Sequence, residues 1–157
     1  WPNMEHATPP YALVVNFPLV DMGPENGATE IWPGTHKDTS IAMTDGDIKV
    51  TEEQLAKWRA IHPPIQPRVR AGSVLIRDIR MWHAGMPNPS DHHRPMAALI
   101  HWVGWWHLEP EMAFPKSAEP FFLKSRLRTV AKFVDDSEFE YLNRTGAYEY
   151  TPEPSGV

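Results

Sequence analysis

The sequence predicts a mainly β domain with one or two helices, arranged as a sandwich or a double-stranded barrel. Seventeen prolines and nine glycines divide its 157 residues into short segments, several of them rich in branched and aromatic side chains. Such segments typically form short strands joined by turns. We expect a single domain over residues 1–157, with barrel strands in 10–108 and a helical and extended C-terminal segment in 109–157.

Two strands are expected near the start of the chain. Residues 11–20 (YALVVNFPLV) are nearly continuously apolar, as in a strand that is buried on both faces. Pro18 lacks a backbone N–H, so this strand must bend or lie at a sheet edge near its end. The turn-forming MGPENG follows, and then the strand-like ATEIW of residues 28–32, which ends at Pro33–Thr35.

A helix is predicted over Glu52–Ile61. Thr51 and Gln54 have the spacing of a capping box, in which the two residues satisfy each other's backbone N–H groups. Apolar residues then recur at helical intervals until two prolines end the segment. These apolar residues are Leu55, Trp58 and Ile61.

Further strands are expected in the middle of the chain. Residues 68–70 and 73–79, separated by a turn at Ala71–Gly72, form a strand pair that leads to Trp82 and His83. Residues 95–106 (PMAALIHWVGWW) form another long strand.

After Glu109 the pattern changes from strand-like to helical. Leucines and valines at helical spacing predict a helix over Phe121–Phe133 that packs outside the strands. The tail from Thr145 onward is expected to be extended.

Composition excludes several classes of protein. Without cysteine, neither a disulfide framework nor a thiolate metal site is possible, which fits a reducing compartment and predicts a cytoplasmic location. A formal charge of −5 with no basic run argues against a nucleic-acid surface. No apolar run is long enough to span a membrane. Because the chain starts at Trp1 with neither methionine nor a signal-like segment, we expect a piece of a longer protein.

One of the eight histidines stands out as a candidate metal ligand. The others lie beside prolines, in polar loops or beside the tryptophan-rich strand, whereas His83 ends an apolar strand, where a barrel would hold it rigidly near one mouth. Arg94 starts the next strand, and an antiparallel hairpin would bring it back close to His83. A guanidinium fits a carboxylate bidentately, so this pair suits a metal with a dicarboxylate co-substrate. Spacing alone leaves open an ordinary loop with a surface arginine.

Two motifs resemble the phytanoyl-CoA dioxygenase family of iron(II)- and 2-oxoglutarate-dependent oxygenases. They are NGATEIWPGTH, residues 26–36, and WHAGMPNPSDHHRP, residues 82–95, within a resemblance that covers roughly residues 10–103. The resemblance implies a double-stranded β-helix, a jelly-roll or cupin-like barrel, with iron held by two histidines and one carboxylate. It also implies that His83 is the distal histidine of this triad and that Arg94 pairs with the far carboxylate of 2-oxoglutarate.

Three further residues acquire expected roles from the resemblance. Thr29 follows the glycine turn, where its hydroxyl is expected to reach the co-substrate. Asn16 interrupts an apolar strand and is expected to point into the barrel toward the same ligand. For both, a polar group satisfied by backbone stays an alternative. Asn88 is expected to tie down the loop backbone, a structural role, and no residue is assigned as catalytic.

The first two iron ligands of the family, an HxD or HxE pair, are missing from their usual place before the strand of residues 11–20. The only HxD string is His36–Lys37–Asp38, which falls in a turn that does not bind iron in this family. We therefore expect the pair upstream of Trp1, no turnover by residues 1–157 alone, and action on a small organic substrate in the intact protein. The alternative is a non-catalytic, cupin-like ligand-binding or scaffold domain. Neither the substrate nor the oligomeric state is predicted.

Overall fold

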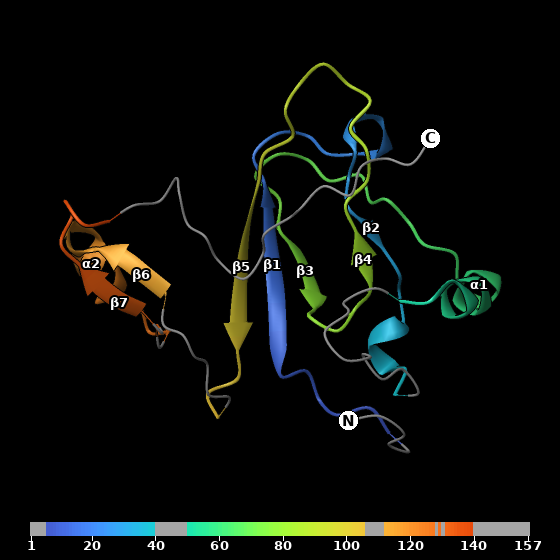
Figure 1. The fold of residues 1–157 in the computed structure, drawn as a ribbon, viewed down its shortest axis with the longest axis horizontal. Helices are drawn as coiled ribbons and strands as arrows, with labels where there is room; N and C mark the ends of the chain where they lie inside the picture. Colours follow the sequence, from blue (N-terminus) through green and yellow to red (C-terminus); the bar gives the residue numbers. More distant parts are fainter. Residues whose placement is uncertain (1–5, 40–49, 106–111, 128, 130, 140–157) are drawn as a thin grey trace. The chain divides into compact units, whose positions relative to one another are not determined.

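The computed structural model describes residues 6–39, 50–105, 112–127, 129 and 131–139. The chain divides into two compact units, residues 1–106 and 107–157, and each is described by itself. The described residues form mainly strands and only two α-helices, as the sequence predicts (Figure 1). None of these helices is long and apolar enough to cross a bilayer.

A three-stranded antiparallel sheet forms the centre of the first unit. Strand β1 (Ala12–Pro18) lies between β3 (Leu75–Asp78) and β5 (Met96–Trp102). Strand β1 ends at Pro18, as expected for a residue that cannot donate to the ladder. The three long predicted strands are therefore confirmed, each with shorter bounds.

A second, two-stranded sheet contains the candidate metal ligand. Strands β2 (Glu30–Ile31) and β4 (His83–Ala84) pair antiparallel, with Ile31 opposite His83. In Figure 1 this pair lies on the β3 side of the larger sheet. The predicted strand at 68–70 is reduced to one bridge, between Val69 and Met22. Within the described part of the chain the two sheets do not close into a barrel.

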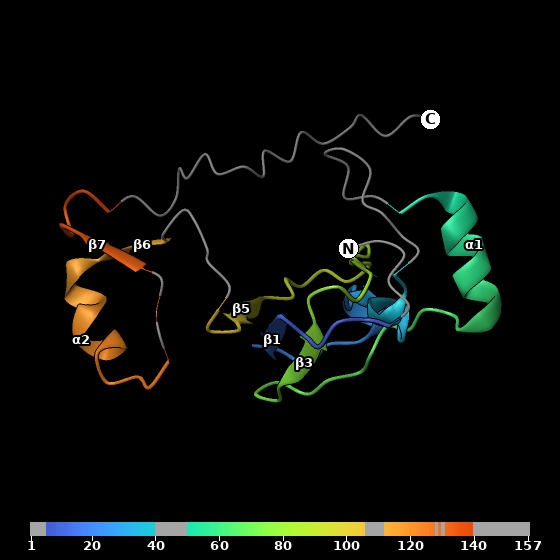
Figure 2. The same cartoon turned by 90° about the horizontal axis from the view of Figure 1, so that it is seen from below.

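Helix α1 (Glu52–Ile61) has the bounds that its capping box predicts. The Thr51 hydroxyl accepts a hydrogen bond from the backbone N–H of Gln54, which satisfies a donor of the first turn. The helix lies at one edge of the first unit in both views (Figures 1 and 2). Its Trp58 indole donates to the Asp38 carboxylate at 2.7 Å, so a side-chain hydrogen bond fastens the helix to the segment after β2.

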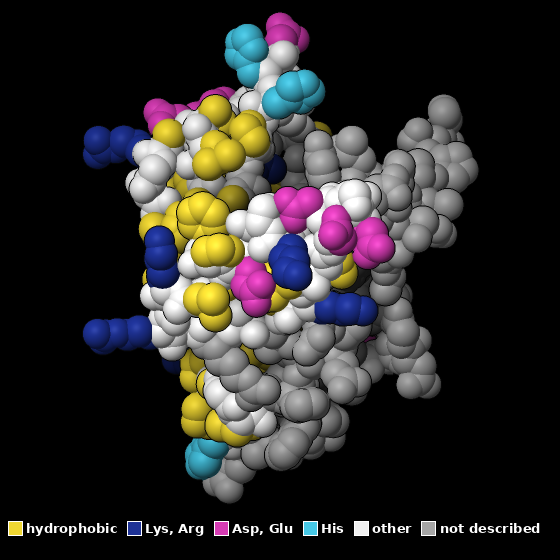
Figure 3. Space-filling model, turned by 90° about the vertical axis from the view of Figure 1, so that its left-hand side faces the viewer, with side chains coloured by type: hydrophobic (Ala, Val, Ile, Leu, Met, Phe, Trp, Pro, Cys, Tyr) yellow, Lys and Arg dark blue, Asp and Glu magenta, His cyan; other side chains and the backbone are white. Residues whose placement is uncertain are grey.

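The core of the first unit lies under one face of β1. Alternate residues of this strand (Ala12, Val14, Asn16 and Pro18) are buried, whereas Leu13 between them is 39% exposed. The 3₁₀-helices η1 (Pro24–Asn26) and η2 (Thr35–Lys37) flank β2. Other apolar side chains reach the surface among charged ones (Figure 3).

The second unit is built around three phenylalanines. Strand β6 (Met112–Pro115) pairs in parallel with β7 (Ala131–Val134), and η3 (Lys116–Ala118) and α2 (Glu119–Phe122) lie between them in sequence. The rings of Phe114, Phe122 and Phe133 pack together, with centroids 4.7 to 6.5 Å apart.

The predicted helix over Phe121–Phe133 is wrong. Helix α2 ends at Phe122, and Leu123 and Leu127, which suggested an apolar helical face, are both exposed. Strand pairing with β6 places Phe133 against the other two rings, and this packing outweighs the helical spacing. The tail from Thr145 lies outside the described residues.

Candidate metal and co-substrate site

His83 has the hydrogen bonding of a histidine prepared to bind a metal. Its Nδ1 lies 3.0 Å from the carbonyl oxygen of Met81 and 3.4 Å from Nη1 of Arg77. Because the carbonyl only accepts and the guanidinium only donates, Nδ1 can serve one of these two contacts at a time. When its proton is directed to Met81, which is the shorter contact, the lone pair lies on Nε2. Metal-bound histidines typically donate their other ring N–H to such a partner.

The surroundings of His83 favour its neutral form. Burial, and next the positive charge of Arg77, lower the pKa of His83, while the hydrogen bond to Met81 acts in the opposite direction. These effects favour the neutral imidazole, which is the form that binds a metal ion.

A small backbone network holds the residue before His83. The Trp32 N–H donates to the Trp82 carbonyl at 3.0 Å. The hydroxyl of Thr35, a residue only 2% exposed, accepts from the Trp82 N–H at 3.0 Å and donates to the Trp32 carbonyl at 2.8 Å. One buried hydroxyl thus joins the ends of β2 and the segment that leads into β4.

Arg94 lies just before β5 and has free capacity to bind an anion. Its Nη1 contacts only the Met22 sulfur, at 3.7 Å, and its Nε is buried without a hydrogen-bond partner. No ion pair joins it to a carboxylate of the described residues. A buried guanidinium N–H without an acceptor is costly, so this side chain fits a site completed by a bound carboxylate.

The loop between His83 and Arg94 is held by Asn88 and by a glycine turn. The Asn88 amide donates to the His92 carbonyl and accepts from the Ser90 N–H and hydroxyl, which confirms its predicted structural role. Gly27 (φ 72°) packs against this loop so closely that a Cβ there would lie 2.7 Å from the Pro87 carbonyl oxygen. The turn inside the first motif therefore supports the loop of the second.

Asn16 and Thr29, the two further residues predicted to contact the co-substrate, lie in different parts of the first unit. Asn16 is 4% exposed on the covered face of β1, in register with Leu75 and Ala98, and Thr29 is partly buried just before β2. Among the described residues, neither side chain has a hydrogen-bond partner. Their contacts with a co-substrate stay predictions, as do the roles of His83 and Arg94.

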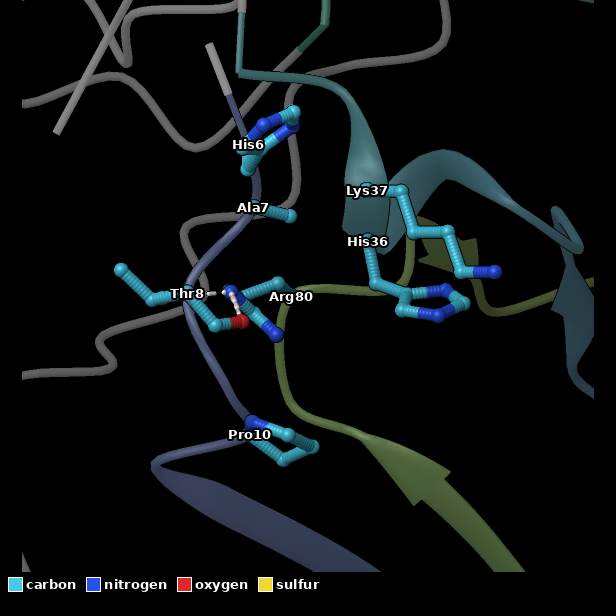
Figure 4. A pocket seen from close by; sticks show the side chains of 7 residues that line it. All are labelled: His6, Ala7, Thr8, Pro10, His36, Lys37 and Arg80. Atoms are coloured by element: carbon cyan, nitrogen blue, oxygen red, sulfur yellow. Dashed lines mark hydrogen bonds between the residues drawn. The ribbon is translucent and has the colours of Figure 1, made fainter. Parts of the chain in front are cut away.

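A pocket of about 440 Å³ opens beside the start of β1, and sequence reasoning missed it (Figure 4). Its wall includes Arg80, which donates to the Thr8 hydroxyl at 2.9 Å and forms an ion pair with Asp78 at 2.7 Å. Burial by itself raises the pKa of Asp78, but the hydrogen bonds and charge of Arg80 outweigh it and hold the pKa below its ordinary value. The charged residues within the otherwise apolar strand VLIRDIR were the available signal for a buried charge.

The HxD string does not form a metal site in the described part of the chain. His36 lines the pocket just described, whereas the Asp38 carboxylate accepts the hydrogen bond from Trp58. No group of three or more histidine, aspartate or glutamate side chains comes together among the described residues. The residues present therefore fit one position of a facial triad, at His83, and not all three.

Comparison with known proteins shows the family to which this chain belongs. The family model for phytanoyl-CoA dioxygenase (PhyH) matches residues 1–96, which contain both motifs, His83 and Arg94. The chain belongs to the phytanoyl-CoA dioxygenase family.

Three solved structures are similar to this chain, each at 24% identity. EctD from S. alaskensis with 2-oxoglutarate and 5-hydroxyectoine has a TM-score of 0.46, over 57% of this chain and 30% of that one. EctD from S. alaskensis with bound Fe has a TM-score of 0.49, over 62% and 34%. AviO1 from Streptomyces viridochromogenes Tue57 has a TM-score of 0.48, over 68% and 45%. The matched region thus spans less than half the length of each of these proteins.

Proposed function

We propose that this chain supplies one iron ligand and the co-substrate anchor of an Fe(II)- and 2-oxoglutarate-dependent dioxygenase that hydroxylates a small organic substrate. A cytoplasmic location, expected from the cysteine-free sequence, is part of the proposal. The observation that carries it is the 3.0 Å contact between Nδ1 of His83 and the Met81 carbonyl within the family-matched region, because the tautomer with its proton on Nδ1 presents Nε2 to a metal. The remaining HxD ligands come from outside the described residues.

Arg94 binds the far carboxylate of 2-oxoglutarate in this proposal. Its unpartnered Nε and its position just before β5 support the role, because a charge-assisted bond would satisfy a buried donor. Thr29 and Asn16 provide polar contacts to the same co-substrate. When bound, the iron supplies the activation of dioxygen that is coupled to the decarboxylation of 2-oxoglutarate to succinate.

The test is succinate formation by the intact protein, the polypeptide that includes its HxD pair, supplied with iron, ascorbate and 2-oxoglutarate. His83→Ala should abolish both succinate formation and the stoichiometric binding of Fe(II). His92→Ala, in the exposed loop, is the matched control and should change neither. Arg94→Gln should weaken 2-oxoglutarate binding about tenfold or more while leaving metal binding intact.

Two results would overturn the proposal. If the intact protein binds no iron, the chain is part of a non-catalytic cupin-like module. If His83→Ala keeps its metal affinity, the ligand is another residue.

A further inference from the structure

The pocket beside the start of β1 is lined by groups that donate hydrogen bonds. Its wall is formed by three segments that are far apart in the sequence, residues 6–10, residues 36–37 and Arg80 (Figure 4). The polar side chains that they contribute belong to His6, Thr8, His36, Lys37 and Arg80. Among the described residues, no aspartate or glutamate lines the pocket. A cavity whose wall carries charge of one sign attracts ligands of the opposite sign, here anions.

Arg80 organises this wall. Its Nε and Nη2 donate to the two carboxylate oxygens of Asp78 at 2.9 and 2.7 Å, so the charge of Asp78 is neutralised beside the pocket. Its Nη1 donates to the carbonyl and to the hydroxyl of Thr8, at 3.1 and 2.9 Å. Because the Thr8 hydroxyl accepts from Arg80, its own hydrogen can be donated to a ligand.

Two further side chains of the wall have capacity for an anion. Lys37 forms no ion pair with a carboxylate in the part of the chain that the structure describes. The Nδ1 atom of His36 is buried and has no hydrogen-bond partner in the same part of the chain. A buried polar atom of this kind is usually satisfied, and an oxygen acceptor in the pocket would satisfy it when Nδ1 carries the ring proton.

Separate single donors fit a phosphate group better than a carboxylate. A carboxylate pairs best with the two parallel N–H groups of a guanidinium fork, and the fork of Arg80 is occupied by Asp78. Lys37 offers a point charge, which suits phosphate, and Thr8 lies on the other side of the pocket from His36 and Lys37 (Figure 4). The cavity of about 440 Å³ is within the usual range for small-molecule sites, so it has room for an organic group beyond the phosphate.

We propose that this pocket binds the phosphate group of a small organic molecule, held by Thr8, His36 and Lys37. The inference goes beyond the proposed function and does not depend on it. None of these three residues is assigned to the iron or to 2-oxoglutarate, and no metal takes part in the binding. Arg80 is a positioning residue, because it holds the Thr8 hydroxyl in the wall.

The test is a calorimetric titration of the intact protein, prepared without iron, with phenyl phosphate, with benzoate as the matched carboxylate, and with inorganic phosphate. Phenyl phosphate should bind saturably, and benzoate about tenfold more weakly or not at all. Lys37→Gln should bind phenyl phosphate about fivefold to tenfold more weakly, because a charge-assisted bond is lost, and Lys37→Arg should keep most of the affinity. Lys124→Gln, which removes an exposed lysine of the second unit, is the matched control and should bind as the wild type does.

NMR of the wild type, labelled with ¹⁵N in histidine and arginine, keeps the test decisive even if a variant is unstable. Phenyl phosphate should shift the ring signals of His36. Shifts at Arg94 without shifts at His36 would mean that the anion occupies the co-substrate anchor, and the inference would be wrong. Absence of saturable binding, equal binding of benzoate, or unchanged affinity in Lys37→Gln would also overturn it. Binding of inorganic phosphate but not of phenyl phosphate would reject the organic ligand.

Discussion

At the residue scale, the hydroxyl of Thr35 holds the segment that leads into His83, because it bonds to both Trp32 and Trp82. We expect Thr35→Val to lower the free energy of unfolding by about 1–3 kcal/mol, because the part-buried Trp82 N–H loses its acceptor and the Trp32 carbonyl loses a donor. Urea denaturation measures this loss, and hydrogen exchange of the Trp82 amide should become faster.

Thr35→Ser is the matched control for this change. It keeps the hydroxyl and should retain slow exchange at Trp82. Equal destabilisation of the serine and valine variants would show that the methyl group, and not the hydrogen bonds, matters at this buried position.

Asp78 gives the first unit a pH-dependent contribution to stability. Its folded pKa is lowered, so the ion pair with Arg80 stabilises the protein fully above the ordinary aspartate value of about 3.9 and is lost as the pH falls through the folded pKa. Asp78→Asn should cost about 1.5–3 kcal/mol at pH 7 and progressively less below pH 4. Thermal unfolding between pH 3 and 7 measures the difference, with the exposed Asp91→Asn as control. A difference from wild type that does not change with pH would contradict this account.

The role of a side chain can be predicted from the sequence when its hydrogen-bond partners are close along the chain. The loop role of Asn88 could be predicted because its partners Ser90 and His92 lie within a few positions. The link between Arg80 and Thr8 could not, because it joins residues 72 positions apart and depends on how the strands are arranged.

At the scale of elements, two glycines allow the energetic cost of backbone strain to be distinguished from the cost of close packing. Gly27 and Gly72 both have positive φ, 72° and 76°, but a Cβ at position 27 would meet backbone oxygens of Met86 and Pro87, whereas nothing lies within 4 Å at position 72. Gly72→Ala should cost about 1–2 kcal/mol from the left-handed conformation alone. Gly27→Ala should cost about 2–4 kcal/mol, because the loop backbone must also move.

Denaturant unfolding of the two variants tests this comparison directly. The Gly27→Ala spectrum should also show shifts in the loop of residues 85–94, and the Gly72→Ala spectrum should not. Equal costs with no loop shifts would mean that the turn and the loop are not packed together as described.

Elements could be predicted where local signals and packing agree. Helix α1 has its predicted bounds because the Thr51–Gln54 capping box is a local signal that tertiary contacts do not oppose. The segment after Phe121 was misread because Leu123 and Leu127 have helical spacing, yet strand pairing and the phenylalanine cluster determine its structure. Spacing alone does not reveal a parallel pairing between segments that are distant in sequence.

At the scale of the whole molecule, the 157-residue chain should not turn over 2-oxoglutarate on its own. Its described residues hold no cluster of three metal-binding side chains, so His83 lacks the partners of a facial triad. Succinate should stay at background with added iron and ascorbate, measured against the intact protein. Succinate formation that His83→Ala abolishes would contradict this and return His36 and Asp38 to consideration as ligands.

The mainly β class followed from the sequence, whereas the closed barrel that the family resemblance implied is not formed by the described strands. Strands β3 and β5 each pair on one side within those residues, and β2–β4 and β6–β7 form separate sheets. Closure requires strand pairings between distant segments, which composition and spacing do not specify. The class could be predicted from short strands and turns, but the number of sheets could not.

The packing of Gly27 against the backbone of residues 86 and 87 also bears on protein engineering. The two family motifs act as one interlocked module, although 45 residues, 37–81, lie between them. A loop of residues 85–94 grafted from a relative to alter substrate range will keep its shape only if the glycine turn that supports it is transferred as well. Libraries that diversify this loop should therefore keep Gly27 fixed and vary the positions that face away from it.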